Sequence, residues 1–94
     1  MDLNLTNQVA IIIGGASGIG FAIAKEFAHE GCRVAIIDKS DQTESQARRA
    51  SEGPGSQPVL GLVADVTDYA ALQAAAKRAH DTLGSVQHVV YAAR

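Results

Sequence analysis

The chain has 94 residues, a formal net charge of −2 at pH 7 and one cysteine, and 47% of its residues are hydrophobic. This length fits one small domain over residues 1–94, and the slight acidity, with Lys and Arg scattered along the chain, gives no electrostatic case for binding nucleic acid. The single Cys32 cannot form an internal disulfide and no apolar run is long enough to span a membrane, so we expect a cytoplasmic protein with neither a nucleic-acid nor a membrane partner.

Apolar residues along the chain alternate between two patterns. Short β-branched runs predict strands, and apolar residues three or four positions apart predict helices. The expected strands are Gln8–Ile13, Arg33–Asp38, Pro58–Val63 and Val86–Tyr91, and the expected helices are Gly18–Glu30, one from the N-cap Ser40 to about Glu52, and one from the N-cap Thr67 to Gly84. This βαβαβαβ order predicts an α/β fold, a parallel sheet with helices on both faces.

The segment from Val9 to Gly20 is the most informative stretch. A buried strand ends in glycines, and a helical pattern begins at once. The unpaired N–H groups of a helix N-terminus attract a phosphate or pyrophosphate. We expect Gly14 to let the chain leave the strand, Gly18 to let the backbone approach a ligand, and Gly20 to pack the helix closely on the sheet. A glycine-rich loop alone is a weak signal.

Three further features follow the other strands. Asp38 ends the second strand, where a carboxylate can accept both ribose hydroxyls of an adenosine. Asp65-Val66 follows the third strand and could contact an adenine, and the small residues Ala92-Ala93 follow the fourth. Asp38 or Asp65 alone would be interpreted as an ordinary turn residue. Together, at the carboxyl ends of parallel strands, these residues predict a site for an adenine dinucleotide.

These motifs resemble the N-terminal half of the short-chain dehydrogenase/reductase family over essentially the whole chain. The family's TGxxxGxG loop aligns with residues 13–20, its strand-two acid with Asp38, its Asp-Val pair with Asp65-Val66 and its NNAG segment with residues 91–94. The resemblance implies half of a Rossmann-type doubly wound sheet in the strand order 3-2-1-4, and a nicotinamide dinucleotide cofactor. The cofactor-binding residues that it implies are Gly14, Ser17, Gly18, Ile19, Gly20, Asp38, Asp65, Val66, Ala92 and Ala93.

NAD is expected rather than NADP. Asp38 would repel a 2′-phosphate, and Ser17, a position that is often basic in NADP-using members, is neutral. Lys39 is the counter-argument, because a neighbouring cation can attract a phosphate.

The chain departs from the family pattern at several positions. Ile13 replaces a Thr, Tyr91 and Ala92 replace two Asn, and Arg94 replaces a Gly. The family's catalytic Ser and Tyr-x-x-x-Lys pair would lie beyond Arg94, and neither Tyr69 nor Tyr91 is followed by a lysine four positions later. In the whole enzyme, a hydride would pass between NAD and an alcohol or carbonyl substrate.

We therefore expect these residues to bind the cofactor without catalysis. The alternative is a non-catalytic dinucleotide-binding or self-assembling interaction module. A fourth strand at the edge of the sheet, Val86–Tyr91, would be unpaired, so we expect a homodimer through this strand.

The histidines and the cysteine are expected to have packing or surface roles. His29, His80 and His88 lack the spacing of metal ligands, so no metal site is expected. Cys32 is interpreted as a small buried apolar residue rather than a nucleophile.

Overall fold

The computed structural model describes residues 6–16, 18–53 and 56–92. The elements are β1 (Val9–Ile13), α1 (Gly18–His29), β2 (Arg33–Asp38), α2 (Thr43–Ala50), β3 (Val59–Val63), α3 (Tyr69–Leu83) and β4 (His88–Tyr91). All pairings in the sheet are parallel, and the strand order is β3-β2-β1-β4. Both the predicted α/β class and the predicted strand order are confirmed. In the described residues, no helix has the length and apolar character needed to cross a membrane.

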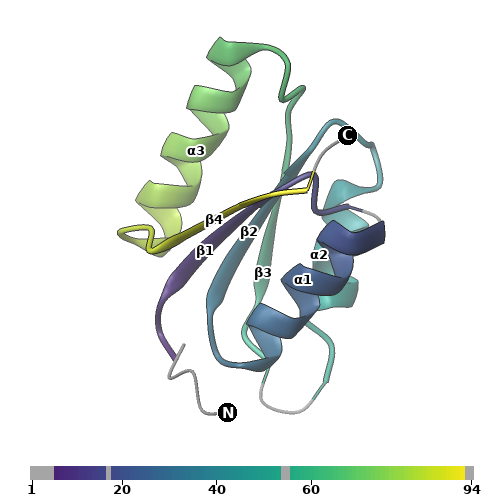
Figure 1. Ribbon diagram of the computed structural model, residues 1–94, viewed down its shortest axis with the longest axis vertical. Coiled ribbons are helices and arrows are strands. Elements are labelled where there is room, and N and C mark those ends of the chain that lie inside the picture. Colours follow the sequence, from purple (N-terminus) through teal and green to yellow (C-terminus); the bar gives the residue numbers. More distant parts are fainter. Residues whose placement is uncertain (1–5, 17, 54–55, 93–94) are drawn as a thin grey trace.

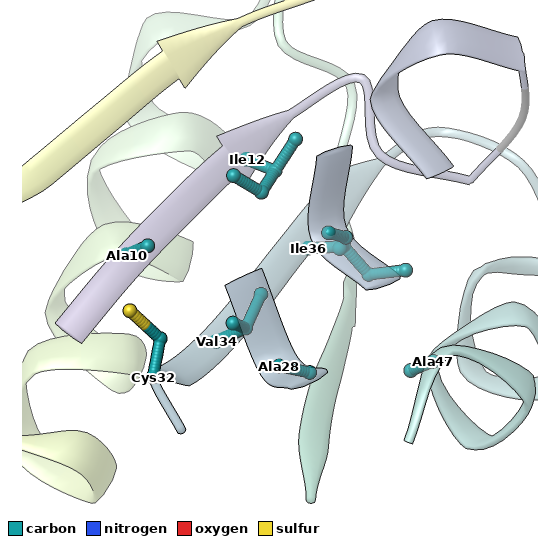
Figure 2. Packing of buried hydrophobic residues seen from close by; sticks show 8 residues of the cluster. Ala10, Ile12, Ala28, Cys32, Val34, Ile36 and Ala47 are labelled. Atoms are coloured by element: carbon teal, nitrogen blue, oxygen red, sulfur yellow. The ribbon is translucent and has the colours of Figure 1, made fainter. Parts of the chain in front are cut away.

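Helices cover both faces of the sheet. Figure 1 shows α1 and α2 against one face and α3 alone against the other. On the face of α1 and α2, Ile12 and Ile36 pack with small residues such as Ala28 and Ala47 (Figure 2). On the face of α3, Ile11 and Ile37 pack with Leu62, Ala75 and Ala79. Side chains that point alternately to the two faces bury β1 and β2 on both sides, so these strands form the rigid centre.

Cys32 belongs to this core. Its side chain is fully buried beside Ala10 and Val34 (Figure 2). Burial raises the pKa of the Cys32 thiol, and the charge of Glu30 raises it further. A raised pKa keeps the thiol protonated and poorly nucleophilic, which agrees with the interpretation of Cys32 as a packing residue.

The two predicted N-caps are wrong. The Ser40 hydroxyl accepts the N–H of Gln42, and its carbonyl accepts the N–H of Thr43, so residues 40–42 form a turn and α2 begins only at Thr43. Helix α3 is capped by Asp68, whose carboxylate accepts the N–H of Ala71. Serine, threonine and aspartate compete for the same backbone donors, so adjacent candidates cannot be separated by residue type alone.

The turn from β1 into α1 depends on glycine at two positions. A Cβ atom at Gly20 would lie 2.1 Å from the Gly14 carbonyl oxygen, and one at Gly15 would lie 2.6 Å from Cγ2 of Ile36. Any side chain at either position would push α1 or the loop away from the sheet. The expected role of Gly20 in close packing is therefore correct, and its partner is the end of β1.

We expect Gly20→Ala to destabilise the fold. The new methyl group meets backbone rather than a flexible side chain, and overpacking of this kind costs about 1–3 kcal/mol. Urea denaturation should show the loss in the free energy of unfolding, whereas Ala22→Ser, at an exposed position of the same helix, should change it by under about 0.5 kcal/mol. Equal stability of the two variants would contradict the close approach.

Candidate functional site

The carboxyl ends of the four strands lie along one edge of the sheet. The backbone N–H of Gly14 donates to the Ile37 carbonyl at 2.7 Å, and that of Ala92 donates to the Ile13 carbonyl at 2.7 Å. On the other side, the N–H of Ala64 donates to the Asp38 carbonyl at 2.9 Å. Each of these bonds continues the ladder past the end of a strand. The residues that follow β1 and β3 therefore flank the end of β2 at Asp38, and Ala92 after β4 lies on the far side of β1.

The glycine-rich loop offers open backbone at this edge. Gly14 and Gly18 have φ values of 86° and 60°, which L side chains rarely adopt. A Cβ atom at Gly18 would meet no atom within 4 Å, so a ligand has space to approach the backbone here. Ile19, the next residue, is 69% exposed. The φ of Gly14 agrees with its predicted role in leaving the strand, and the ligand contact at Gly18 stays a prediction.

Asp38 connects β2 to the loop. Its Oδ2 accepts the N–H of Ala16 at 3.1 Å, and its Oδ1 accepts the N–H of Ser40 at 3.1 Å. Each carboxylate oxygen has a second lone pair, so the half-buried carboxylate retains acceptor capacity after these bonds. Asp38 therefore both orders the glycine-rich loop and presents a negative charge beside it.

Gln46 also contacts the loop, and sequence reasoning missed it. Its Nε2 donates to the Ala16 carbonyl at 2.7 Å from helix α2. Gln46 lies in a polar stretch with Gln42 and two arginines, so nothing in the local pattern distinguishes it. Only the packing of α2 against the sheet places it beside Ala16.

Asp65 and Val66 lie further along the same edge. The exposed Asp65 accepts the Thr67 hydroxyl at 2.7 Å and the Thr67 backbone N–H at 2.9 Å, both through Oδ1. The Thr67 hydroxyl, then its N–H, and more weakly the charge of Lys39 lower the pKa of Asp65. Val66 is half-buried against the cluster beneath α3. Asp65 thus stabilises the turn after β3, and Val66 packs against the core.

Three of the predicted site residues, Ala92, Ser17 and Ala93, remain to be placed. Ala92 follows β4 at the same edge, beside the 66% exposed Tyr91. Ser17 and Ala93, which the resemblance also implicates, lie outside the described residues. Among the described residues, the structure brings together the glycine-rich loop, Asp38 and the start of the Asp65 turn.

A parallel sheet with a glycine-rich turn from its central strand into a helix, and an acid at the end of the neighbouring strand, defines the doubly wound class of nucleotide-binding folds. Comparison with known proteins narrows this class. The family model described as short chain dehydrogenase matches residues 8–93. The chain belongs to the short-chain dehydrogenase/reductase family, whose members bind nicotinamide dinucleotides.

Individual relatives agree with this assignment. The chain is 40% identical over 90 residues to 2-(S)-hydroxypropyl-CoM dehydrogenase 3 of Xanthobacter autotrophicus, covering 96% of this chain and 35% of the relative. It is 37% identical over 86 residues to oxidoreductase UcpA of Salmonella typhimurium, covering 92% and 32% respectively. The chain spans about a third of the length of these relatives.

A solved structure shares the fold. The crystal structure of a short chain dehydrogenase from Bacillus anthracis superposes with a TM-score of 0.81 at 27% identity, covering 93% of this chain and 34% of that one. The arrangement of strands and helices is therefore that of the family.

Thr67→Val should raise the pKa of Asp65. The substitution keeps the side-chain shape but removes the hydroxyl donor, the largest cause of the lowered value. Because the folded-state pKa is depressed, the stabilisation from this bond is present above the unfolded-state pKa and lost as pH falls through the folded-state pKa. A carboxyl NMR titration measures the change, with the exposed Thr82→Val on α3 as control. An Asp65 pKa that is the same in both variants would refute the hydroxyl's role.

Proposed function

We propose that this chain binds NAD at the carboxyl edge of the sheet, as the cofactor-binding part of an oxidoreductase. The observation that carries the proposal is the hydrogen bond from the Ala16 N–H to Oδ2 of Asp38. It connects the glycine-rich loop, suited to phosphate, with a carboxylate suited to ribose hydroxyls. A pyrophosphate and the ribose attached to it need these two features side by side.

Each predicted residue has a role in this proposal. Gly14, Gly18 and Gly20 shape the loop, and the N-terminus of α1 faces the pyrophosphate. Asp38 accepts the ribose hydroxyls, while Asp65 and Val66 lie toward the adenine. The family motifs also imply cofactor contacts for four further residues, Ser17, Ile19, Ala92 and Ala93. The nicotinamide, when bound, would supply or accept a hydride from an alcohol or carbonyl compound.

The choice of NAD over NADP rests on charge. A 2′-phosphate placed where Asp38 meets the ribose would be repelled, by about 1–4 kcal/mol for charges 4 Å apart near a protein surface. The half-buried position of Asp38, held by two backbone N–H groups, keeps its carboxylate from turning away. Lys39, by contrast, is exposed.

Catalysis by these residues alone is not part of the proposal. Four positions after Tyr69 the chain has Gln73, where the family's catalytic pair has Lys. The alternative function is a non-catalytic binding module. Nicotinamide absorbance in the presence of NAD and simple alcohols tests the lack of catalysis that both functions share, because turnover by the 94-residue chain would contradict either one.

Asp38→Ala should reduce the ratio of NAD to NADP affinity by about tenfold or more. The change removes both the acceptor for the ribose hydroxyls and the repulsion of a 2′-phosphate, and a hydrogen bond to a charged group contributes about 1.5–3 kcal/mol. Loss of the Ala16 contact affects both cofactors alike, so the ratio isolates the effect on the ribose. Calorimetric titration measures it, with the exposed Asp41→Ala as a charge-matched control. Tighter binding of NADP by the unaltered chain would overturn the choice of NAD.

We also propose that β4 pairs with β4 of a second copy. Val89 and Tyr91 are 64% and 66% exposed. Their register with Ile11 and Ile13 places them on the face of the sheet that α3 covers. An edge strand with apolar side chains on an incompletely covered face favours strand pairing, and two-fold symmetry makes that pairing antiparallel.

Val89→Lys should convert the dimer into a monomer. A charge on an edge strand blocks pairing, and the exposed site tolerates lysine without loss of core packing. Light scattering after size exclusion, over a range of concentrations, measures the mass. Val63→Lys, at an exposed position on the opposite edge strand β3, is the matched control and should remain dimeric. A monomeric unaltered chain would refute the dimer.

A further inference from the structure

We propose that Gln46 is a positioning residue for dinucleotide binding, which holds the glycine-rich loop against Asp38 through the Ala16 carbonyl. The inference rests on the proposed binding of NAD and adds to it a residue outside the family motifs described above. Gln46 does not touch the predicted ligand positions itself. It acts through the loop backbone.

Ala16 is held from two different elements. Its N–H donates to Oδ2 of Asp38, at the end of β2, at 3.1 Å, and its carbonyl accepts Nε2 of Gln46, in α2, at 2.7 Å. Ala16 itself is buried. It lies between glycines at positions 14, 15 and 18, whose backbones have the greatest conformational freedom. The two bonds therefore supply the restraint that this glycine-rich loop lacks.

The amide of Gln46 is already oriented for this contact. Its Oε1 accepts Nη1 of Arg49 at 3.0 Å, one turn further along α2. An arginine only donates hydrogen bonds, so the oxygen of the amide must face Arg49 and the NH2 group faces Ala16. The Arg49 guanidinium lies 5.6 Å from the centre of the Phe21 ring in α1, a cation–π distance. The contact with Arg49 thus favours the amide orientation in which Gln46 donates to Ala16.

Helix α2 is a firm support for this contact. Gly61 of β3 lets α2 approach so closely that a Cβ atom there would lie 2.9 Å from the Thr43 carbonyl oxygen and 3.0 Å from Cβ of Ala47. Thr43 is fully buried, and its hydroxyl donates to the Ser40 carbonyl at 2.6 Å. Since α2 cannot shift without disturbing β3, the position of Gln46 relative to the loop is restrained.

The consequence concerns the unliganded protein. A loop that is already ordered loses less conformational freedom when a ligand binds, and preorganisation of this kind increases affinity. Without the Gln46 donor, the Ala16 carbonyl loses its side-chain partner and the bond from Ala16 to Asp38 opens more often. NAD must then order the loop as it binds. One lost hydrogen bond corresponds to an affinity about threefold to tenfold weaker.

The test uses Gln46→Met, which keeps the length of the side chain and its neutrality but removes the donor. Gln73→Met, at an exposed glutamine of α3 on the other face of the sheet, is the matched control. The first measurement, without cofactor, is amide hydrogen exchange at Ala16, with Ile12 in the buried strand β1 as internal reference. We expect several-fold faster exchange at Ala16 in Gln46→Met only, and unchanged exchange at Ile12. The second is NAD affinity, which should fall about threefold to tenfold in Gln46→Met only.

The two measurements separate this inference from the proposed function. Unchanged exchange at Ala16 in Gln46→Met would overturn the inference, and so would faster exchange with unaltered NAD affinity. Faster exchange at Ile12 as well would assign Gln46 a role in global stability and overturn the positioning role. If the unaltered chain bound no NAD, the proposed function would fail and the role of Gln46 in binding with it, while exchange at Ala16 would still decide whether Gln46 orders the loop.

Discussion

The carbonyl oxygen of Gly14 occupies space that a side chain at Gly20 would need, with only 2.1 Å between that oxygen and the position of a Cβ atom. This approach brings the start of α1 against the end of β1, and it forces the connecting residues into a tight loop beside β2. In this loop the Ala16 N–H donates to Asp38 at the end of β2. The lack of a side chain at Gly20 therefore lets the helix N-terminus lie close to the strand that pairs with β2, and Asp38 ends β2.

The two faces of the sheet contribute differently to the site. The face covered by α1 and α2 is closed by small residues, which let both helices lie near the strands (Figure 2). That closeness is what allows a side chain of α2 to reach the loop after β1. Among the described residues, the other face is covered by α3 alone (Figure 1). The side chains of Val89 and Tyr91 in β4 are exposed. The tightly packed face therefore supports the glycine-rich loop, and the face that α3 covers is left partly exposed at β4.

Sequence patterns predicted every strand and helix and the meeting of the loop with Asp38, whereas the strand order came from the resemblance to the family. These features depend on periodicity, on glycine and on the rule that parallel strands end at one edge. The start of α1 was correct, but the predicted caps of α2 and α3 were wrong. Before α2, Ser40 accepts the N–H of Gln42 in a turn, and before α3 the Thr67 N–H and hydroxyl bond to Asp65 while Asp68 accepts the N–H of Ala71. Gln46 and Gly15 were missed because their importance comes from contacts with residues 30 and 21 positions away, respectively, which no local pattern encodes.

The strand order also constrains the sequence of events during folding. The central strand β1 pairs with β2 after a short helical connection, but its other partner, β4, comes from much later in the chain. The Val9 N–H donates to the Gln87 side chain across 78 positions, and Gln8 meets His88 across 80. Contacts of such long range form slowly, because closing the intervening chain must precede any gain from pairing. During synthesis, one side of β1 therefore waits for residues 78 and 80 positions later, and β1 is the segment we expect to need protection from aggregation in the meantime.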